Sequence, residues 1–425
     1  MSNSLNVSMI VIGDEILNGR TTDLNGSWLS KFLFRKGLNL KSLRFIRDDS
    51  KEIDQALKLS LNESDIVITS GGIGPTIDDK TKKALASFFG KQIIQRDDVA
   101  KIVTQNYIQF GRSWTPDHNH YHFFPEDFIA TNNPRGLAPG LVYFDQSTTK
   151  LILAGPGVPR EFTEIVECEF FPLIKKFFNR QIKENYQTVI RTKGVPEEMI
   201  FFELCPTLWQ DLEAFGKVSS LPHTIGIDIV VSYNGSKSIH LDNQQKIKSL
   251  IEKSPLAQYV WQYGNNSLNE LVLARSLLLN KTFAIAESCT GGLTSSKITD
   301  LSGSSQFFMG GVITYSNQAK IDLLGVNPQS LEDHGAVSAE VATQMAEGVR
   351  HKFKTDYAIS ITGIAGPTGE TKDKPLGLVY IGFANEFQSG AKMFQMPGDR
   401  IRRKERFSDT ALLILLEMMN EQLNQ

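Results

Sequence analysis

The stretch Ser64–Gly90, SDIVITSGGIGPTIDDKTKKALASFFG, decides the fold of the N-terminal part of the chain. An apolar run ends in clustered glycines, and a segment with the apolar spacing of a helix follows. This order predicts a β-strand, a glycine loop and an α-helix. We expect further strands at 7–12, at 40–49 and at the start of 150–162, with helices at 24–36 and 50–64. Strands that alternate with helices predict a doubly wound α/β sheet, in which ligands bind beyond the carboxyl ends of the strands.

The rest of the chain is expected to form two further α/β parts. Strands at 185–195 and 222–233, with an amphipathic helix near 196–214, predict a small α/β module. A helix near residue 266 begins the last part, whose strands are expected in TFAIAE, FFMGGVITYSN, TDYAISITG and GLVYIGFAN. The predicted domains are 1–170, 171–260 and 261–425.

Composition excludes several classes of protein. The formal net charge is −2, so a basic field for nucleic acid is absent and no nucleic-acid partner is expected. Cys168, Cys205 and Cys289 lie far apart, which predicts neither a disulfide framework nor a cysteine zinc site. No positively charged leader precedes the first apolar run, and no stretch reaches the ~18 apolar residues of a membrane span. We therefore expect a cytoplasmic protein with no membrane partner.

The string SGGIGPTIDD predicts a phosphate site that uses a metal ion. At the start of a helix, clustered glycines expose backbone N–H groups, which favour an anion. Aspartates there would repel bare phosphate, but they fit a divalent cation bridging carboxylates and phosphate oxygens. The alternative is that they only cap the helix. The expected metal ligands are Asp14, Glu15 and Asp79. The expected site around them comprises Ser70, Gly71, Gly72, Gly74, Asp48, Asp78, Asp79 and Glu161.

The string AESCTGGL, residues 286–293, suggests a nucleophile after another apolar run. Serine needs a base to act as a nucleophile, and a lysine with a lowered pKa can replace histidine. Because TYSNQAK supplies a tyrosine and a lysine, Ser288, Tyr315 and Lys320 form a candidate catalytic set. The structural alternative for Lys320 alone is a solvated surface residue.

Two features of the same string remain open on the residues alone. Backbone N–H groups near Gly291 and Gly292 are expected to form an oxyanion hole. Cys289 is a rival nucleophile, although a single cysteine after a buried strand is also typical of a packed small residue.

Two more groups of side chains are candidates for binding. The segment GDRIRRKERF contains arginines that would hold a substrate phosphate, unless they only solvate a helix start. These are Arg400, Arg402, Arg403 and Arg406. The segment HNHYHF contains alternating histidines, a pattern that allows a metal site on a strand. These are His118, His120 and His122. The flanking Pro116 and Pro125 favour an irregular surface segment instead.

Several long strings resemble those of the competence/damage-inducible CinA family, in the same order and over nearly the whole length. The strings GDEIL, SGGIGPTIDDKT, NPRGLAPG and AGPGVPREF are similar to the molybdopterin-binding MogA/MoaB-like domain. The strings AESCTGGL, GSSQFF, GGVITYSNQAK, LLGV, HGAVS, SITGIAGPTG and GDR resemble the PncC-type nicotinamide-nucleotide amidase domain. The resemblance implies three-layer α/β folds for both terminal domains.

The resemblance implies two activities and a homodimer. The C-terminal domain is expected to hydrolyse nicotinamide mononucleotide to nicotinate mononucleotide and ammonia, without a cofactor. It implies Ser288 rather than Cys289 as nucleophile, with Lys320 and Tyr315 as base and relay. The implied substrate-binding residues are Gly291, Gly292, Ser305, Thr362, Gly363, Arg400 and Arg403. The N-terminal domain is expected to be an ADP-ribose pyrophosphatase that uses a divalent ion of the Mg, Mn or Co class.

Two alternatives stay open. In the first, the N-terminal domain of an amidase only binds a nucleotide or a pterin. In the second, the protein is not catalytic and acts in DNA uptake or damage response, which the charge balance does not favour. The segment HNHYHF also departs from what the family resemblance leads us to expect.

Overall fold

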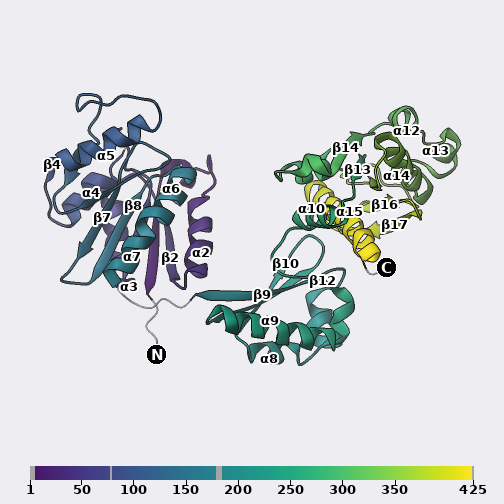
Figure 1. The fold of residues 1–425 in the computed structure, drawn as a ribbon, viewed down its shortest axis with the longest axis horizontal. Coiled ribbons are helices and arrows are strands. Elements are labelled where there is room, and N and C mark those ends of the chain that lie inside the picture. Colours follow the sequence, from purple (N-terminus) through teal and green to yellow (C-terminus); the bar gives the residue numbers. More distant parts are fainter. Residues whose placement is uncertain (1–4, 77–78, 179–183, 424–425) are drawn as a thin grey trace. The chain divides into compact units, whose positions relative to one another are not determined.

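The computed structural model describes residues 5–76, 79–178 and 184–423. Contacts divide the chain into two compact units (Figure 1). The first comprises Met1–Gln187 with Ser232–Asp242, and the second comprises Thr188–Val231 with Asn243–Gln425. None of the helices within the described ranges is long and apolar enough to cross a membrane.

The first unit is built on a six-stranded sheet of order β2-β1-β3-β8-β7-β6. Strands β2, β1, β3 and β8 are parallel, whereas β7 is antiparallel to both of its neighbours, β8 and β6. The strands are β1 (Asn6–Ile12), β2 (Asn39–Ile46), β3 (Ile66–Ser70), β6 (Ile129–Thr131), β7 (Gly140–Asp145) and β8 (Lys150–Gly155), with a separate β4 (Ile93–Gln95) and β5 (Phe123–Pro125) pair. The helices are α1 (Asp14–Leu17), α2 (Asn25–Arg35), α3 (Ser50–Glu63), α4 (Thr81–Phe88), α5 (Asp97–Ile108), α6 (Pro159–Ile165) and α7 (Phe171–Phe178), with a π-helical turn at Val166–Phe170.

Side-chain alternation along β1 explains the three layers of this unit. Val7 and Met9 face a core shared with α2, α6 and α7, whereas Ile10 and Ile12 face a core shared with α3, α4 and α5. A strand buried on both faces needs apolar residues at every position, which is why VSMIVI is nearly continuous in apolar character. The predicted doubly wound α/β fold is confirmed for this unit.

The middle of the chain forms a four-stranded sheet of order β10-β11-β9-β12. Its strands are β9 (Asn185–Thr192), β10 (Lys217–Pro222), β11 (Ile227–Asn234) and β12 (Val260–Tyr263), with α8 (Leu208–Glu213), α9 (Lys237–Glu252), a π-helical turn at Met199–Leu204 and a 3-10 turn at Pro255–Tyr259.

Two predictions in the middle part are wrong in detail. The helix expected at 196–214 is broken between Leu204 and Leu208, because Pro206 has no N–H to donate and interrupts the helical bonding. The strand expected at 222–233 begins only at Ile227. A tight turn precedes it, in which the N–H of His223 donates to the carbonyl of Gly226 at 2.9 Å.

The C-terminal part has a five-stranded sheet of order β14-β13-β15-β16-β17. Its strands are β13 (Phe283–Glu287), β14 (Phe308–Ile313), β15 (Tyr357–Gly363), β16 (Leu378–Ala384) and β17 (Ser389–Gln395). Its helices are α10 (Leu268–Leu279), α11 (Leu293–Thr299), α12 (Asn317–Leu324), α13 (Pro328–His334), α14 (Ala339–Phe353) and α15 (Arg400–Leu423), with a 3-10 turn at Ser304–Gln306.

This sheet is also covered on both faces. Phe283 and Ile285 of β13 pack with α10, α11 and α15, while Ala284 and Ala286 pack with α12, α13 and α14. The small alanines allow α14 to approach the sheet. Because β13, β14 and β15 are parallel, the loops that follow them gather at one edge of the sheet. The strings AESCTGG, TYSN and ITGIAGP span the ends of these strands and the loops that follow them.

Candidate functional sites

The turn that carries Ser288 begins where β13 ends. The Ser288 N–H donates to the carbonyl of Ile361 at 3.0 Å, which ties the turn to β15. Gly291 and Gly292 follow with φ of 63° and 95°, a left-handed backbone that residues with a Cβ rarely adopt. These glycines let the chain reverse directly into α11.

Lys320 reaches Ser288 from the first turn of α12. Its Nζ lies 3.2 Å from the Oγ of Ser288 and donates to the carbonyl of Thr314 at 2.8 Å. Lys320 is only 1% exposed, and burial lowers the pKa of its ammonium below the usual range. A buried lysine with a lowered pKa beside a serine hydroxyl has the geometry of a nucleophile and its base.

Cys289 has the environment of a packed thiol. It is 8% exposed, and burial raises its pKa to about 12. The thiolate is the reactive form of cysteine, so the neutral thiol is a poor nucleophile. The surroundings of the two adjacent residues therefore favour Ser288 over Cys289 as the nucleophile.

The amides of Gly291 and Gly292 are themselves engaged within the turn, so the predicted oxyanion hole near these glycines would have to use neighbouring N–H groups. The N–H of Gly291 donates to the Ser288 carbonyl at 3.1 Å, and that of Gly292 donates to the Glu287 carboxylate at 3.0 Å. The turn uses both amides to hold its own shape. The N–H groups of Cys289 and Thr290 have no backbone acceptor within the described residues, so they are the donors left beside Ser288.

Glu287 organises the turn, and sequence reasoning missed it. Its fully buried carboxylate accepts the N–H groups of Gly292, Thr294 and Ser295 at 3.0, 3.1 and 2.8 Å, and the Ser295 hydroxyl at 2.7 Å. A carboxylate suits the N-terminus of a helix, where N–H groups lack helical partners. The signal in the sequence was an acidic residue that ends an apolar strand just before a helix.

The other hydroxyls of the predicted site lie differently. Tyr315 is 65% exposed, and its hydroxyl accepts from Arg400 at 3.5 Å; within the described residues no hydrogen bond joins it to Ser288 or Lys320. Ser305 is exposed in the 3-10 turn. The Thr362 hydroxyl is buried and donates to the carbonyl of Ala336 at 2.7 Å. The predicted role of each hydroxyl stays a prediction.

Arg400 and Arg403 hold the loop that follows Gly363, the last residue of β15. Arg400 donates to the carbonyl of Gly366 at 2.6 Å, and Arg403 donates to that of Ala365 at 3.2 Å. Each guanidinium thus uses some of its N–H donors on protein carbonyls. Because a guanidinium has five N–H donors, others remain for a substrate. The arginines are brought to the edge of the sheet that carries the Ser288 turn.

Lys404 is a further cation at this edge that sequence reasoning did not single out. A Cβ built on Gly291 would lie 3.8 Å from its Nζ, so the ammonium faces the glycine turn. Among the residues that the structure describes, it has no ion pair or hydrogen bond. The sequence feature that could have identified Lys404 is its position in the basic run RIRRK, directly after the arginines.

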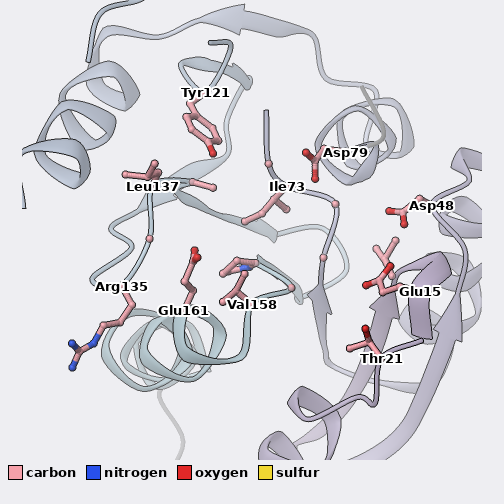
Figure 2. Close-up of a pocket in the computed structure, with 18 of the residues that line it drawn as sticks. Glu15, Thr21, Asp48, Ile73, Asp79, Tyr121, Arg135, Leu137, Val158 and Glu161 are labelled. Atoms are coloured by element: carbon pink, nitrogen blue, oxygen red, sulfur yellow. The ribbon is translucent and has the colours of Figure 1, made fainter. Parts of the chain in front are cut away.

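In the first unit, a cavity of about 680 Å³ opens beyond the carboxyl ends of β1, β2, β3 and β8 (Figure 2). This is where the doubly wound sheet predicted a ligand. The cavity is lined by the predicted residues Glu15, Asp48, Gly71, Gly72, Gly74, Asp79 and Glu161. Aromatic and basic side chains also line it, namely Phe110, Arg112, Tyr121 and Arg135.

The acidic side chains stand on two sides of this cavity. Figure 2 shows Glu15, Asp48 and Asp79 on one side and Glu161 on the other. Burial raises the pKa of Asp48, and the negative charges of Glu15, Asp14 and Asp79 raise it further, against a lowering by the Asp14 amide. Burial also raises the pKa of Glu161, against a hydrogen bond from Asn133 at 2.8 Å. The cavity thus concentrates negative charge that has few cationic partners.

The glycine loop is shaped by close packing. A Cβ on Gly71 would lie 2.2 Å from the carbonyl of Ile12, and a Cβ on Gly74 would lie 2.5 Å from the Asp79 carboxylate. The same carboxylate accepts the backbone N–H of Thr76 at 2.9 Å. Asp79 therefore closes the loop as well as facing the cavity.

Two of the predicted residues that the structure describes, Ser70 and Asp14, do not join the cavity wall. Ser70 is buried beneath it, where its hydroxyl accepts from Asn25 at 2.7 Å and donates to the Pro156 carbonyl at 3.2 Å; because these bonds point it into the protein, the prediction is corrected. Asp14 is exposed at the start of α1 and does not line the cavity. Asp78 lies outside the described residues.

The predicted metal ligands do not form a preformed cluster. Within the described part of the chain, no group of three or more His, Cys, Asp or Glu side chains is arranged to hold a metal ion. The described histidines of HNHYHF therefore do not form such a group either. His118 and His120 are exposed, whereas His122 is 2% exposed and packs against Trp114, so the segment is not wholly a surface one.

Comparison with known proteins identifies the family. A model described as the probable molybdopterin binding domain matches residues 8–176, and one described as the CinA C-terminal domain matches residues 265–419. A putative competence-damage inducible protein of Thermoanaerobacter pseudethanolicus is 34% identical over 399 residues, covering 94% of this chain and 94% of that protein. A CinA-like protein of Chloroherpeton thalassium is 34% identical over 428 residues, covering 97% and 99%.

Among solved structures, the competence/damage inducible protein CihA of Agrobacterium tumefaciens is 36% identical, with a TM-score of 0.33, and covers 38% of this chain and 98% of that chain. The full-length relatives align with almost the whole sequence, including both terminal domains. The chain therefore belongs to the CinA family, with an N-terminal domain of the molybdopterin-binding type and a CinA C-terminal domain.

Proposed function

We propose that the C-terminal domain is an amidase that hydrolyses the carboxamide of nicotinamide mononucleotide, giving nicotinate mononucleotide and ammonia. The observation that carries the proposal is the approach of Lys320 Nζ to Ser288 Oγ at 3.2 Å in a buried setting. Burial lowers the pKa of Lys320, which favours the neutral amine that a general base requires.

The proposed reaction follows from these positions. Neutral Lys320 takes the hydroxyl proton of Ser288, and the serine oxygen bonds to the amide carbon. The N–H groups of Cys289 and Thr290 stabilise the negative charge on the carbonyl oxygen. Lys320 then gives the proton to the leaving nitrogen, ammonia departs, and water hydrolyses the acyl-serine. Tyr315 is proposed to assist at the exposed side of the site.

The basic residues at the same edge support a phosphorylated substrate. Lys404 faces the Ser288 turn without an ion pair in the described structure, and Arg400 lies beside Tyr315. A lysine binds phosphate as a point charge, and an arginine binds it with paired N–H donors.

Ammonia release from nicotinamide mononucleotide by the purified chain tests this proposal. Ser288→Ala is expected to abolish release, while Cys289→Ala is expected to leave much of it. Release that survives Ser288→Ala but fails in Cys289→Ala would overturn the serine assignment. Ammonia is also to be sought from nicotinamide riboside, which lacks the phosphate and should be a poorer substrate.

We further propose that the N-terminal domain hydrolyses the pyrophosphate of ADP-ribose with a divalent metal ion. The observation that favours it is the cavity in which three carboxylates face a glycine loop (Figure 2). Carboxylate oxygens are the donors that hard cations prefer, and the mutual repulsion of Glu15, Asp48 and Asp79 would be relieved by a cation. These three carboxylates do not form a ready-made metal cluster and would have to draw together to hold the ion, which would neutralise charge on the phosphates.

The chain's own groups would position the rest of such a substrate. The glycine loop offers backbone N–H groups to phosphate oxygens, and Phe110 and Tyr121 offer aromatic surface to a nucleobase. Release of AMP from ADP-ribose that requires a divalent ion and is lost in Asp79→Ala would support catalysis. Binding of ADP-ribose without turnover would instead support the interpretation of a nucleotide-binding domain beside an amidase.

A further inference from the structure

A second cavity, of about 880 Å³, lies wholly within the second unit. Its wall is formed by the loop after β9, the β10–β11 turn, the 3-10 turn before β12, β17 and one side of α15. It shares no lining residue with the hydrogen-bonded surroundings of Ser288. The proposed amidase reaction leaves this cavity without a role.

Most of the wall is apolar. The apolar lining includes Val195, Ile225, Phe394, Met396, Leu413 and Ile414. A cavity of this size falls in the range of small-molecule sites, which are usually apolar with a few polar groups that orient the ligand. The wall therefore suits a ligand with an aromatic or aliphatic body.

The charges in the wall are unbalanced. Its ionised groups are Lys193, Lys392, Arg406 and Glu417, three cations against one carboxylate. Glu417 pairs with both lysines, at 3.4 Å for Lys392. Arg406 is partly buried, and among the described residues no hydrogen bond or ion pair engages its guanidinium. None of its nitrogens is among the buried polar atoms that lack a partner, so the guanidinium is still accessible from the cavity, and its planar set of N–H donors can pair with an anion.

The neighbouring histidine cannot balance these cations, because an imidazole ring is either neutral or positively charged. His223 lines the same cavity, and burial lowers the pKa of its ring, against the raising effect of the nearby Asp228 carboxylate. Its nearest carboxylate, Asp228, is engaged by Arg191 at 3.0 Å. Arg406 is thus the group in this wall that remains available to an external anion.

We propose that this cavity binds a small organic anion with an apolar body, whose carboxylate, sulfonate or phosphate is held by Arg406. The body lies against the apolar wall, and the anionic group occupies the end of the cavity at Arg406. The site is separate from both proposed catalytic sites and does not depend on either activity.

The test uses the full-length chain and two fluorescent probes that differ by one charge. The probes are 8-anilinonaphthalene-1-sulfonate and N-phenyl-1-naphthylamine, which has the same rings without the sulfonate. We expect one-to-one binding of the sulfonate, weakened about 10-fold or more by Arg406→Gln, because a charge-assisted hydrogen bond is lost. The affinity of the neutral probe should change less than about 2-fold, since its contacts are apolar.

Matched variants distinguish this site from other apolar surfaces. Arg402→Gln removes an exposed guanidinium from the same helix, outside the cavity, and should leave both probes unaffected. Gln258→Trp places a bulky ring at an exposed position in the wall and should weaken both probes, and circular dichroism checks that each variant is folded. Sulfonate affinity that is unchanged in Arg406→Gln, or a wild-type chain that binds neither probe with one-to-one stoichiometry, would overturn the proposal.

Discussion

Glu287 accepts two hydrogen bonds from Ser295, one from its backbone N–H at 2.8 Å and one from its hydroxyl at 2.7 Å. The other carboxylate oxygen accepts the N–H groups of Gly292 and Thr294. A single buried side chain thus connects the end of β13 to the first turn of α11. The turn that presents Ser288 lies between these two anchors, so its shape depends on Glu287.

Replacing Glu287 by alanine is expected to destabilise the protein by about 3 kcal/mol or more, because it leaves several buried N–H groups without an acceptor. Urea unfolding followed by circular dichroism measures this loss. Glu332→Ala removes an exposed carboxylate from α13 and should change stability by less than about 0.5 kcal/mol. A loss in Glu287→Ala no larger than in this control would show that the carboxylate does not anchor the turn.

The order of strands and helices could be predicted from local patterns, because a strand buried on both faces and an amphipathic helix leave distinct periods in the sequence. The proximity of Ser288 and Lys320 could also be predicted from the order of the strands. Ser288 follows β13 and Lys320 lies shortly after β14, and these two strands are parallel neighbours. The antiparallel strands β6 and β7 were not predicted. Their short, partly exposed sequences lack a period strong enough to mark them.

The hydrogen-bond partners of the predicted site residues could not be predicted from the sequence. An oxyanion hole was expected from backbone N–H groups near Gly291 and Gly292, but the sequence could not show that the carboxylate of Glu287 and the closure of the turn engage the amides of the two glycines themselves. Ser70 was expected at the ligand, but its hydroxyl is taken by Asn25 from a different helix. Such competition between acceptors depends on distances across the fold, which spacing along the chain does not encode.

Lys320→Met is expected to reduce ammonia release from nicotinamide mononucleotide by roughly 10²–10⁴-fold, the usual contribution of a general base. Its melting temperature should not fall, because methionine fills a similar volume and removes a buried amine. Lys320→Arg should be equally inactive, since a guanidinium does not lose its proton near neutral pH. Activity retained in either variant would remove Lys320 from the mechanism.

The lowered pKa of Lys320 predicts the direction in which stability and kcat/KM change with pH. Burial lowers the pKa of folded Lys320 below its ordinary value of 10.5, so the unfolded chain binds more protons between the two values. Its contribution to stability therefore rises with pH across that window, and kcat/KM should rise through the lowered pKa as the free amine forms. A pH–rate profile checks this, and a wild-type profile that falls over this range would contradict it.

Alkylation with iodoacetamide at pH 8 should separate the three cysteines. Cys168 is exposed, whereas Cys205 and Cys289 are buried. With a pKa of about 12, Cys289 is a thiolate in only about one molecule in 10⁴ at this pH. Peptide mass spectrometry is expected to find Cys168 modified first and Cys289 modified only in denaturant. Rapid alkylation of Cys289 with parallel loss of amidase activity would reverse the assignment of the nucleophile.

Asp48→Asn tests whether the acidic side of the N-terminal cavity holds a metal ion. Without metal, removing one negative charge beside Glu15 and Asp79 should raise the melting temperature, because like charges repel at short range. With Mn²⁺ in excess, the wild type should be stabilised by mass action, and this shift should shrink in the variant. Asp54→Asn on the exposed face of α3 is the matched control and should keep the full shift. A Mn²⁺ shift as large in Asp48→Asn as in the wild type would place the ion elsewhere.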